Sequence, residues 1–340
     1  MLRNLRLHPY KVHRDISLND VPPLSVVVGR NNSGKSALLH AIALPKYGIR
    51  WDSVLPTAPF EEVATTAAPP ARIDLDFGSQ HGPLMIEISL VANGTIQWRI
   101  SDTRGGRNAS QQIPAPQQYG RGELNVQQPE AVQQFFLAAE RDLPARSFTY
   151  QAYSRDIGPA GEGCWNALHQ LKADDNPAFE RIRDVLTGLG FGMTGLKTPT
   201  VNPGSGAIRI QNYGRADVLP FMGSGLTSVL PIVTQGILCR RGETFLVEEP
   251  ELHLHRSALD ALAGFFGTLT REGVQVMMTS HSTAFFPCLK VKMDDGTVPN
   301  DLAVYILERS PDGGTSVVRE PLEDYYRANY SAEGVLRRSS

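Results

Sequence analysis

The sequence predicts an α/β fold with a mixed central sheet, because two different strand patterns occur along the chain. Short apolar runs rich in branched or aromatic residues, typical of buried parallel strands, occur on both sides of a long middle region. In that region, other runs alternate apolar and polar residues, as half-buried antiparallel strands do. The buried runs are residues 24–28, 135–139, 244–247 and 274–278, and the alternating runs are residues 71–77, 84–90, 95–100 and 207–210.

Helical patterns separate the expected strands. Residues 37–44 consist of strong helix formers. Residues 178–189 follow Pro177 and place apolar side chains on one face of a helix. Residues 226–238 are apolar enough for a buried helix, and a further helix carries the apolar residues from Leu259 to Leu269. We therefore expect residues 1–340 to form a single domain, with a β-rich lobe at 46–134 and a helical lobe at 150–225.

Composition limits the possible classes of protein. The 340 residues are 41% hydrophobic and 20% charged, as in an ordinary globular protein. The formal net charge of −2 removes the general electrostatic argument for nucleic acid or an anionic membrane as an obligatory partner. The three cysteines are far apart, and the N-terminus is charged and lacks the apolar segment of a secretory signal. We expect a cytoplasmic protein with no membrane partner.

The segment between residues 105 and 134 differs in composition from the rest of the chain. It is rich in Gln, Gly, Pro and Asn and contains four Gln-Gln pairs. Such a composition predicts an exposed loop or insertion, and an arm that contacts a partner is the alternative.

A glycine-rich motif follows the first buried run. Residues Gly29–Ser36 fit the pattern G-x-x-x-x-G-K-[ST] between an expected strand and an expected helix. In such a loop, backbone N–H groups surround the β-phosphate, Lys35 bridges the β- and γ-phosphates, and the Ser36 hydroxyl binds Mg²⁺. The motif therefore predicts that the chain binds a nucleoside triphosphate with Mg²⁺. The residues expected to contact it are Gly29, Asn31, Asn32, Ser33, Gly34, Lys35, Ser36 and Ala37.

Two further groups of polar residues follow buried strands. The strand at 244–247 leads into Glu248 and Glu249, and the strand at 274–278 is followed by a polar stretch that includes His281. Adjacent acids in an extended strand point to opposite faces, so we assign Glu248 to the metal and Glu249 to the general base that activates water. His281 could donate a hydrogen bond to the γ-phosphate. The alternatives are a solvated turn for the acids and a structural role for the histidine.

The motifs GRNNSGKS, LVEEPELHLH and MMTSHS together resemble the ABC-type ATPases that include RecF, SMC heads and OLD-like (overcoming lysogenization defect) proteins. The resemblance is strongest to the OLD-like branch and extends to the sequence FLAAERD at residues 136–142. It implies a P-loop NTPase of the ABC-ATPase head type, with an antiparallel β lobe and a helical lobe. It also implies that ATP is bound between two heads and hydrolysed to ADP and phosphate.

The resemblance assigns roles to residues outside these motifs. Residues 221–226 occupy the place of the signature motif, so Ser224 and Gly225 would contact the γ-phosphate held by the other subunit. A helix cap is the alternative. Residues 251–255 resemble the D-loop, and two histidines there are too few to predict zinc. The glutamine of the family's Q-loop is replaced by Glu140 and Arg141, either of which could contact the metal, its water or a phosphate, or form a surface ion pair. Glu140 is therefore a further candidate metal ligand.

These expectations define a function. About sixty residues follow His281, too few for the Toprim nuclease domain that OLD-like proteins often carry. We expect an ATPase subunit whose ATP-dependent homodimerisation controls a separate effector chain, such as a nuclease, in bacterial anti-phage defence. The alternative is a RecF- or SMC-like ATPase of DNA repair or chromosome maintenance, for which nucleic acid would be a partner. A transporter subunit is disfavoured because the sequence lacks its signature motif and Q-loop.

Overall fold

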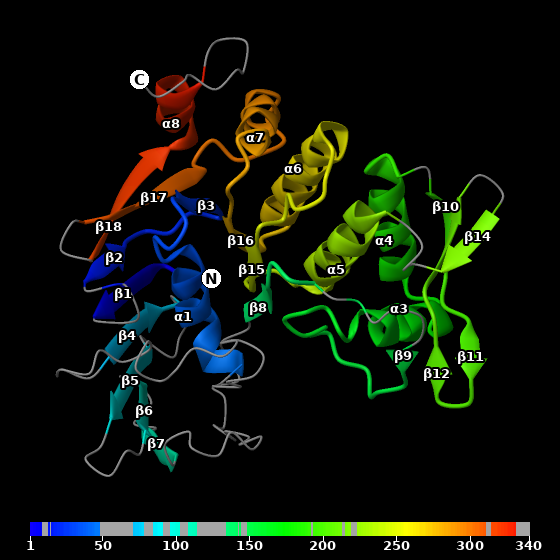
Figure 1. Cartoon of the computed structure of the whole chain (residues 1–340), viewed down its shortest axis with the longest axis horizontal. Coiled ribbons are helices and arrows are strands. Elements are labelled where there is room, and N and C mark those ends of the chain that lie inside the picture. Colours follow the sequence, from blue (N-terminus) through cyan, green and yellow to red (C-terminus); the bar gives the residue numbers. More distant parts are fainter. Residues whose placement is uncertain are drawn as a thin grey trace. The chain divides into compact units, whose positions relative to one another are not determined.

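The computed structural model divides the chain into two compact units, each of which contains strands and helices (Figure 1). Unit 1 comprises Met1–Gln134 and Asp301–Pro321, and unit 2 comprises Phe135–Asn300 and Leu322–Ser340. Neither unit coincides with a lobe expected from the sequence. The structure describes residues 1–8, 13, 15–47, 71–77, 84–90, 96–102, 108–113, 134–141, 143, 148–191, 193–212, 215–218, 223–310 and 314–330.

The predicted first strand and helix of unit 1 are confirmed. Strand β3 (Leu24–Gly29) pairs in parallel with β17 (Ala303–Arg309), which pairs antiparallel with β18 (Thr315–Pro321). The valines in the middle of β3 are fully buried, as expected for a strand covered on both faces. Helix α1 (Lys35–Tyr47) starts within the glycine-rich motif and extends past the predicted end at residue 44. Both parallel and antiparallel pairing occur here, as a mixed sheet requires.

The antiparallel part of unit 1 is a sheet whose described strands have the order β2-β1-β4-β5-β6-β7 (Figure 1). In β1, Leu5 lies opposite Leu18 on one neighbour and Leu75 on the other, and all three side chains are buried. Aligned leucines on three strands therefore form one buried face. The strands are β1 (Asn4–His8), β2 (Ile16–Leu18), β4 (Ala71–Asp76), β5 (Leu84–Leu90), β6 (Ile96–Asp102) and β7 (Asn108–Ile113).

Strand β7 corrects part of the prediction for the glutamine-rich segment. Residues 108–113 are a strand that pairs antiparallel with β6, where the sequence predicted a loop or an arm. An edge strand is held by backbone hydrogen bonds to a single neighbour, so a polar composition does not prevent it. Residues 103–107 and 114–133 lie outside the described residues, and the predictions for them stay predictions.

Unit 2 contains three buried strands in the order β16-β15-β8, of which β15 and β16 run parallel. Every residue of the three strands is buried. Helix α6 buries the predicted apolar face, including Leu262 and Phe266. The elements are β8 (Gln134–Leu137), β15 (Thr244–Glu248), α6 (Arg256–Arg271), β16 (Gln275–Thr279), α7 (Phe285–Asp294) and α8 (Leu322–Asn329).

The remaining part of unit 2 combines helices with small sheets (Figure 1). Helix α4 (Pro177–Gly188) starts as predicted: the Asn176 side chain accepts a hydrogen bond from the Ala178 N–H at 2.9 Å, and Pro177 occupies the first turn. The other helices are α3 (Cys164–Ala173) and α5 (Ser224–Leu238). The strands are β9 (Phe148–Thr149), β10 (Met193–Lys197), β11 (Thr200–Asn202), β12 (Ser205–Gly206), β13 (Arg209–Asn212) and β14 (Arg215–Val218).

These small sheets make the lobe less helical than the sequence predicted. The described strands form two three-stranded sheets, ordered β10-β13-β14 and β11-β12-β9. Each strand has five residues or fewer, and only β13 overlaps an alternating run named in the sequence analysis, at residues 207–210. None of the described helices has the length and apolarity that a membrane span requires.

Candidate functional site

The glycine-rich loop of unit 1 connects the end of β3 to the start of α1. A Cβ atom at Gly29 would lie 2.5 Å from both the Leu307 carbonyl oxygen and the Ser33 hydroxyl, so no larger residue fits. Gly34 has a φ of +98°, which residues with a side chain rarely adopt. Both glycines of the motif are therefore required by the shape of the backbone.

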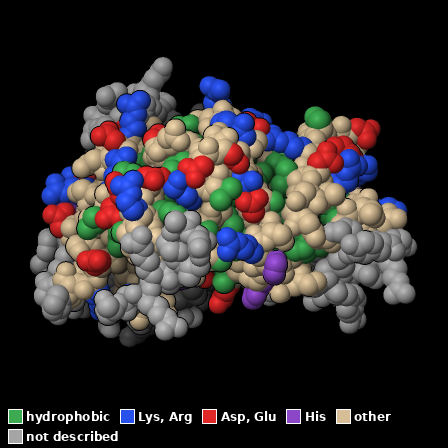
Figure 2. Space-filling model, turned by 90° about the horizontal axis from the view of Figure 1, so that it is seen from above, with side chains coloured by type: hydrophobic (Ala, Val, Ile, Leu, Met, Phe, Trp, Pro, Cys, Tyr) green, Lys and Arg blue, Asp and Glu red, His purple; other side chains and the backbone are tan. Residues whose placement is uncertain are grey.

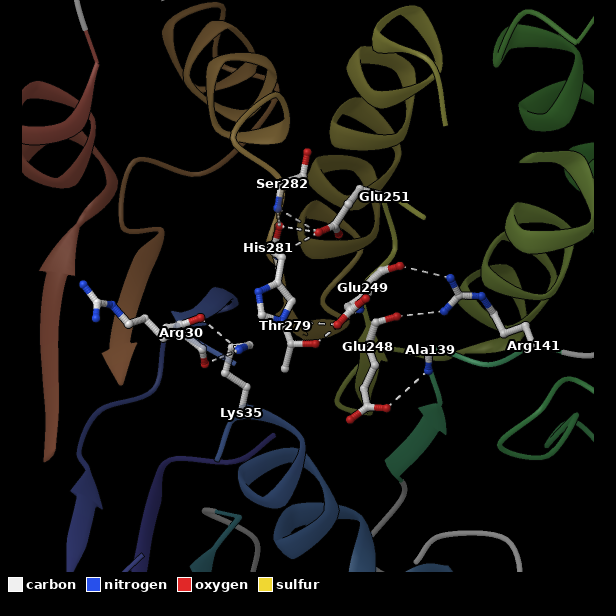
Figure 3. Close-up of polar contacts among 12 residues, drawn as sticks. Arg30, Lys35, Ala139, Arg141, Glu248, Glu249, Glu251, Thr279, His281 and Ser282 are labelled. Carbon is white, nitrogen blue, oxygen red and sulfur yellow. Dashed lines mark hydrogen bonds and ion pairs between the residues drawn. The ribbon is translucent and has the colours of Figure 1, made fainter. Parts of the chain in front are cut away.

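Lys35 lies inside this loop with only 6% of its surface exposed. Its Nζ donates hydrogen bonds to the carbonyl oxygens of Gly29 at 2.9 Å and Arg30 at 3.0 Å (Figure 3). Ser36 is exposed on the first turn of α1, whereas Ser33 and Ala37 are buried. The loop thus holds an ammonium group at its centre and presents a hydroxyl at the N-terminal end of a helix, where anions are favoured.

Two residues that the sequence analysis missed hold the loop from outside. His13 is fully buried, and its Nε2 lies 3.0 Å from the Gly34 carbonyl oxygen. Because a carbonyl oxygen only accepts hydrogen bonds, this nitrogen carries the proton. The Thr315 hydroxyl donates to the Ser33 carbonyl oxygen at 3.2 Å. These partners are 21 and 282 positions from the residues they bind, so no local motif could reveal them.

The two predicted acids of unit 2 lie at the end of β15 and differ in backbone conformation. Glu248 is the last residue of the strand, and its carboxylate is buried and accepts a hydrogen bond from the Ala139 N–H at 3.2 Å. Glu249 has a φ of +41°, and its N–H lies within hydrogen-bond distance of both Thr279 oxygens, the carbonyl at 3.1 Å and the hydroxyl at 3.2 Å. A left-handed backbone at a residue other than glycine is sparsely populated and occurs preferentially at functional sites.

The structure brings the predicted base and the predicted histidine together. The Nε2 atom of His281 lies 3.4 Å from Oε1 of Glu249, and both side chains are partly exposed. The contact arises because β15 and β16 are parallel neighbours, so the residues that follow them meet at the same edge of the sheet. The two side chains can therefore act on one group.

Arg141 binds the backbone at Glu248 and Glu249, where the turn after β15 begins. Its terminal nitrogens donate to the carbonyl oxygens of Ala138, Glu248 and Glu249 at 2.8, 2.8 and 3.0 Å, and to the Ser228 hydroxyl of α5 at 3.0 Å (Figure 3). Burial lowers the pKa of Arg141 to about 10, although the nearby carboxylates oppose this shift. The guanidinium stays charged at neutral pH.

The surface ion pair considered for Arg141 is therefore wrong, because its nitrogens bind partly buried backbone carbonyl oxygens and a hydroxyl. Glu140 is exposed, and its role as a metal ligand stays a prediction.

The predicted signature residues lie at the start of α5. Ser224 is exposed and Gly225 is buried. A Cβ atom at Gly225 would come within 2.8 Å of the His253 carbonyl oxygen, so glycine allows α5 to approach the turn after β15. Phe221 and Met222 lie outside the described residues. His253 and His255 are exposed, and no group of three or more His, Cys, Asp or Glu within the described chain could hold a metal ion.

Comparison with known proteins identifies the fold. Residues 176–286 match the family "AAA domain, putative AbiEii toxin, Type IV TA system". The chain is also similar to an Smc head bound to the C-winged helix domain of ScpA, with a TM-score of 0.63, 14% identity, and coverage of 96% of this chain and 99% of that one. The chain has the fold of an ABC-type ATPase head.

Other Smc heads agree with this fold. One, bound to the C-terminal domain of ScpA from Pyrococcus furiosus, has a TM-score of 0.59 at 11% identity, and one from Pyrococcus yayanosii has a TM-score of 0.61 at 10% identity. Each alignment covers 96% of this chain and 98% of the other. No curated protein matches the sequence. The predicted fold class, a P-loop NTPase of the ABC-ATPase head type, is confirmed.

The position of Arg141 in this fold leads to a prediction about stability. Arg141→Ala leaves several partly buried acceptors without their donor, so we expect the free energy of unfolding to fall by about 3 kcal/mol. Arg141→Lys should restore little of it, because an ammonium group cannot span the same acceptors. Urea unfolding followed by circular dichroism measures the change.

Arg183→Ala, which removes an exposed arginine, is the control and should have no measurable effect. Equal stability of the Arg141→Ala and Arg183→Ala proteins would contradict the assigned role.

Proposed function

We propose that the chain is an ATP-binding and ATP-hydrolysing subunit that dimerises around ATP and thereby controls a separate effector. The pairing of Glu249 with His281 carries this proposal, because a carboxylate beside a hydrogen-bonding imidazole suits the activation of water next to a phosphate. The fold similarity and the glycine-rich loop support the nucleotide as the substrate.

The residues of each unit suit one part of this reaction. In unit 1, the loop N–H groups and the Lys35 ammonium would bind the β- and γ-phosphates. The exposed Ser36 hydroxyl and the Glu248 carboxylate are hard oxygen donors of the kind that Mg²⁺ prefers. Bound Mg²⁺ would neutralise phosphate charge. In unit 2, Glu249 would take a proton from the attacking water as the new P–O bond forms and the bond to ADP breaks, with His281 holding the carboxylate.

The dimer and the effector rest on the resemblance and on the relatives. Ser224, exposed at the N-terminal end of α5, would contact the γ-phosphate of a second subunit. Two of the similar Smc heads are bound to a domain of ScpA, so heads of this fold can bind another protein. The description of the matched family includes a putative toxin, and the motifs resemble OLD-like proteins. We infer an anti-phage defence system with a separate nuclease as the effector.

A second candidate is a RecF- or SMC-like DNA clamp, which the similarity to Smc heads favours. DNA would require clustered positive charge, yet Lys and Arg lie among Asp and Glu on the face shown in Figure 2. Some basic side chains are also paired with acids, as Arg181 is with Glu272 and Lys292 with Asp260. DNA retention that falls steeply with salt would support the clamp.

Purification of tagged Glu249→Gln protein from its native cell with Mg·ATP, followed by native mass spectrometry, tests the proposal. We expect a stable complex with a second protein, particularly a nuclease. The control is the double variant Lys35→Ala with Glu249→Gln, which should capture nothing because it cannot bind ATP. A homodimer that carries only nucleic acid would contradict the effector proposal and support the DNA clamp.

A further inference from the structure

Glu251, the third acid of the sequence Glu248-Glu249-Pro250-Glu251, has no part in the chemistry proposed above. It is only 9% exposed and lies in the turn between β15 and α6. Burial raises the pKa of Glu251, which the hydrogen bonds from Ser280 and His281 partly oppose. A buried carboxylate is costly unless hydrogen bonds compensate for the lost hydration. The partners of Glu251 therefore indicate what it does.

A single oxygen of Glu251 accepts hydrogen bonds from three consecutive residues (Figure 3). Oε1 lies 2.7 Å from the Ser280 hydroxyl, 2.8 Å from the His281 N–H and 3.1 Å from the Ser282 N–H. The Ser282 N–H also lies 3.1 Å from the Ser280 hydroxyl oxygen. The carboxylate thus fixes the backbone on both sides of the His281 side chain.

We propose that Glu251 is a positioning residue, which holds His281 where its imidazole meets Glu249. Without Glu251, two N–H groups and one hydroxyl of this loop lose their common acceptor. The imidazole would then sample positions away from Glu249, which it contacts at 3.4 Å. The effect on turnover rests on the proposed ATPase function, whereas the effect on the loop does not.

The same turn also contacts α5. Within the turn, the Leu254 N–H donates to the Glu251 carbonyl oxygen at 3.1 Å. The carbonyl oxygen of His253 packs against Gly225 of α5. The turn that holds His281 through Glu251 therefore also borders the N-terminus of α5 within the same subunit.

The test compares Glu251→Ala with Glu251→Gln, which keeps an acceptor oxygen in the same place. The control is Glu243→Ala. Glu243 is also buried, and its carboxylate accepts hydrogen bonds from Arg155 and from the Arg240 N–H. It directly precedes the first residue of β15, whereas Glu251 follows the last one. Three quantities are measured in each protein: amide hydrogen exchange of His281 and Ser282, the Kd for a fluorescent ATP analogue, and kcat for ATP hydrolysis.

We expect Glu251→Ala to speed exchange at His281 and Ser282 by about tenfold or more, because both amides lose the Glu251 carboxylate and Ser282 keeps only the Ser280 hydroxyl as an acceptor. We expect kcat to fall by about tenfold with an unchanged Kd, since an interaction used in the reaction is lost and ATP binding is not. Glu251→Gln should remain near the wild type in all three measurements. Glu243→Ala should change neither kcat nor the exchange rates of the His281 and Ser282 amides. A general loss of structure would change both.

Several results would overturn the inference. Wild-type exchange rates at His281 and Ser282 in Glu251→Ala would show that the carboxylate does not hold this loop. An equal loss of kcat in Glu243→Ala would show a general structural effect. If Glu251→Ala does not fold, Glu251→Asp replaces it, because its shorter side chain cannot reach all three donors and should show the same two changes. A wild-type protein without ATPase activity would contradict the proposed function, and exchange would still decide the role of Glu251.

Discussion

Lys35→Ala is expected to abolish ATP binding, with a loss in affinity of about 100-fold or more. The Lys35 ammonium lies 2.9 and 3.0 Å from two carbonyl oxygens of the glycine-rich loop and is almost fully buried. Replacing it with a methyl group removes charge-assisted hydrogen bonds to phosphate, which are about twice as strong as neutral ones. The substitution also removes the positive charge between the two carbonyl oxygens and the bound triphosphate, so that the oxygens would repel the phosphates. Titration with a fluorescent ATP analogue measures the loss.

The matched control for this variant lies on the same helix. Lys46→Ala removes a lysine from the last turn of α1, whereas Lys35 is in the first turn, and should bind ATP as the wild type does. Circular dichroism must show that both variants are folded. If Lys35→Ala bound ATP with the affinity of the wild type, this result would contradict nucleotide binding by the glycine-rich loop. It would contradict the proposed function as well.

Glu249→Gln is expected to trap an ATP-bound dimer. The amide of glutamine has nearly the same shape as the carboxylate and can still contact His281, but it cannot take a proton from water. ATP would therefore bind and bring two subunits together, and hydrolysis would not release them. Light scattering with Mg·ATP should give about twice the monomer mass, since the chemistry that reopens the dimer is missing.

Two controls separate trapping from non-specific association. With Mg·ADP, Glu249→Gln should stay monomeric, because the γ-phosphate that would join the two subunits is absent. Glu272→Gln changes an exposed glutamate of unit 2 and should behave as the wild type. Monomers of Glu249→Gln that nevertheless hold ATP would contradict ATP-dependent dimerisation.

The parts of the site that the sequence predicts are those built from neighbouring residues. A strand, a glycine-rich loop and a helix follow one another between residues 24 and 47, and the structure confirms this order. The acids at the end of β15 and the histidine after β16 also follow from the position of polar residues at strand ends. Such features need no knowledge of which strands are neighbours.

The supporting residues could not be predicted, because their contacts join distant parts of the chain. His13 precedes the glycine-rich loop in the sequence and Thr315 follows it by more than 250 positions, yet both contact this loop. Arg141 donates to the Glu248 carbonyl oxygen, which is 107 positions away. The resemblance places Glu251 in a segment like the D-loop and gives it no role, whereas its carboxylate binds residues 280–282 of its own chain. Strand β7 was missed because its composition is polar and its pairing involves the backbone.

The measurement that tests the ATPase function most directly is phosphate release from Mg·ATP by the wild type, Lys35→Ala and Glu249→Gln proteins under identical conditions. We predict that the wild type releases phosphate while both variants do not, and that only Glu249→Gln among the variants still binds ATP. Phosphate release at the same rate in all three proteins, or none in a folded wild type that binds ATP, would contradict hydrolysis by Glu249 at this site.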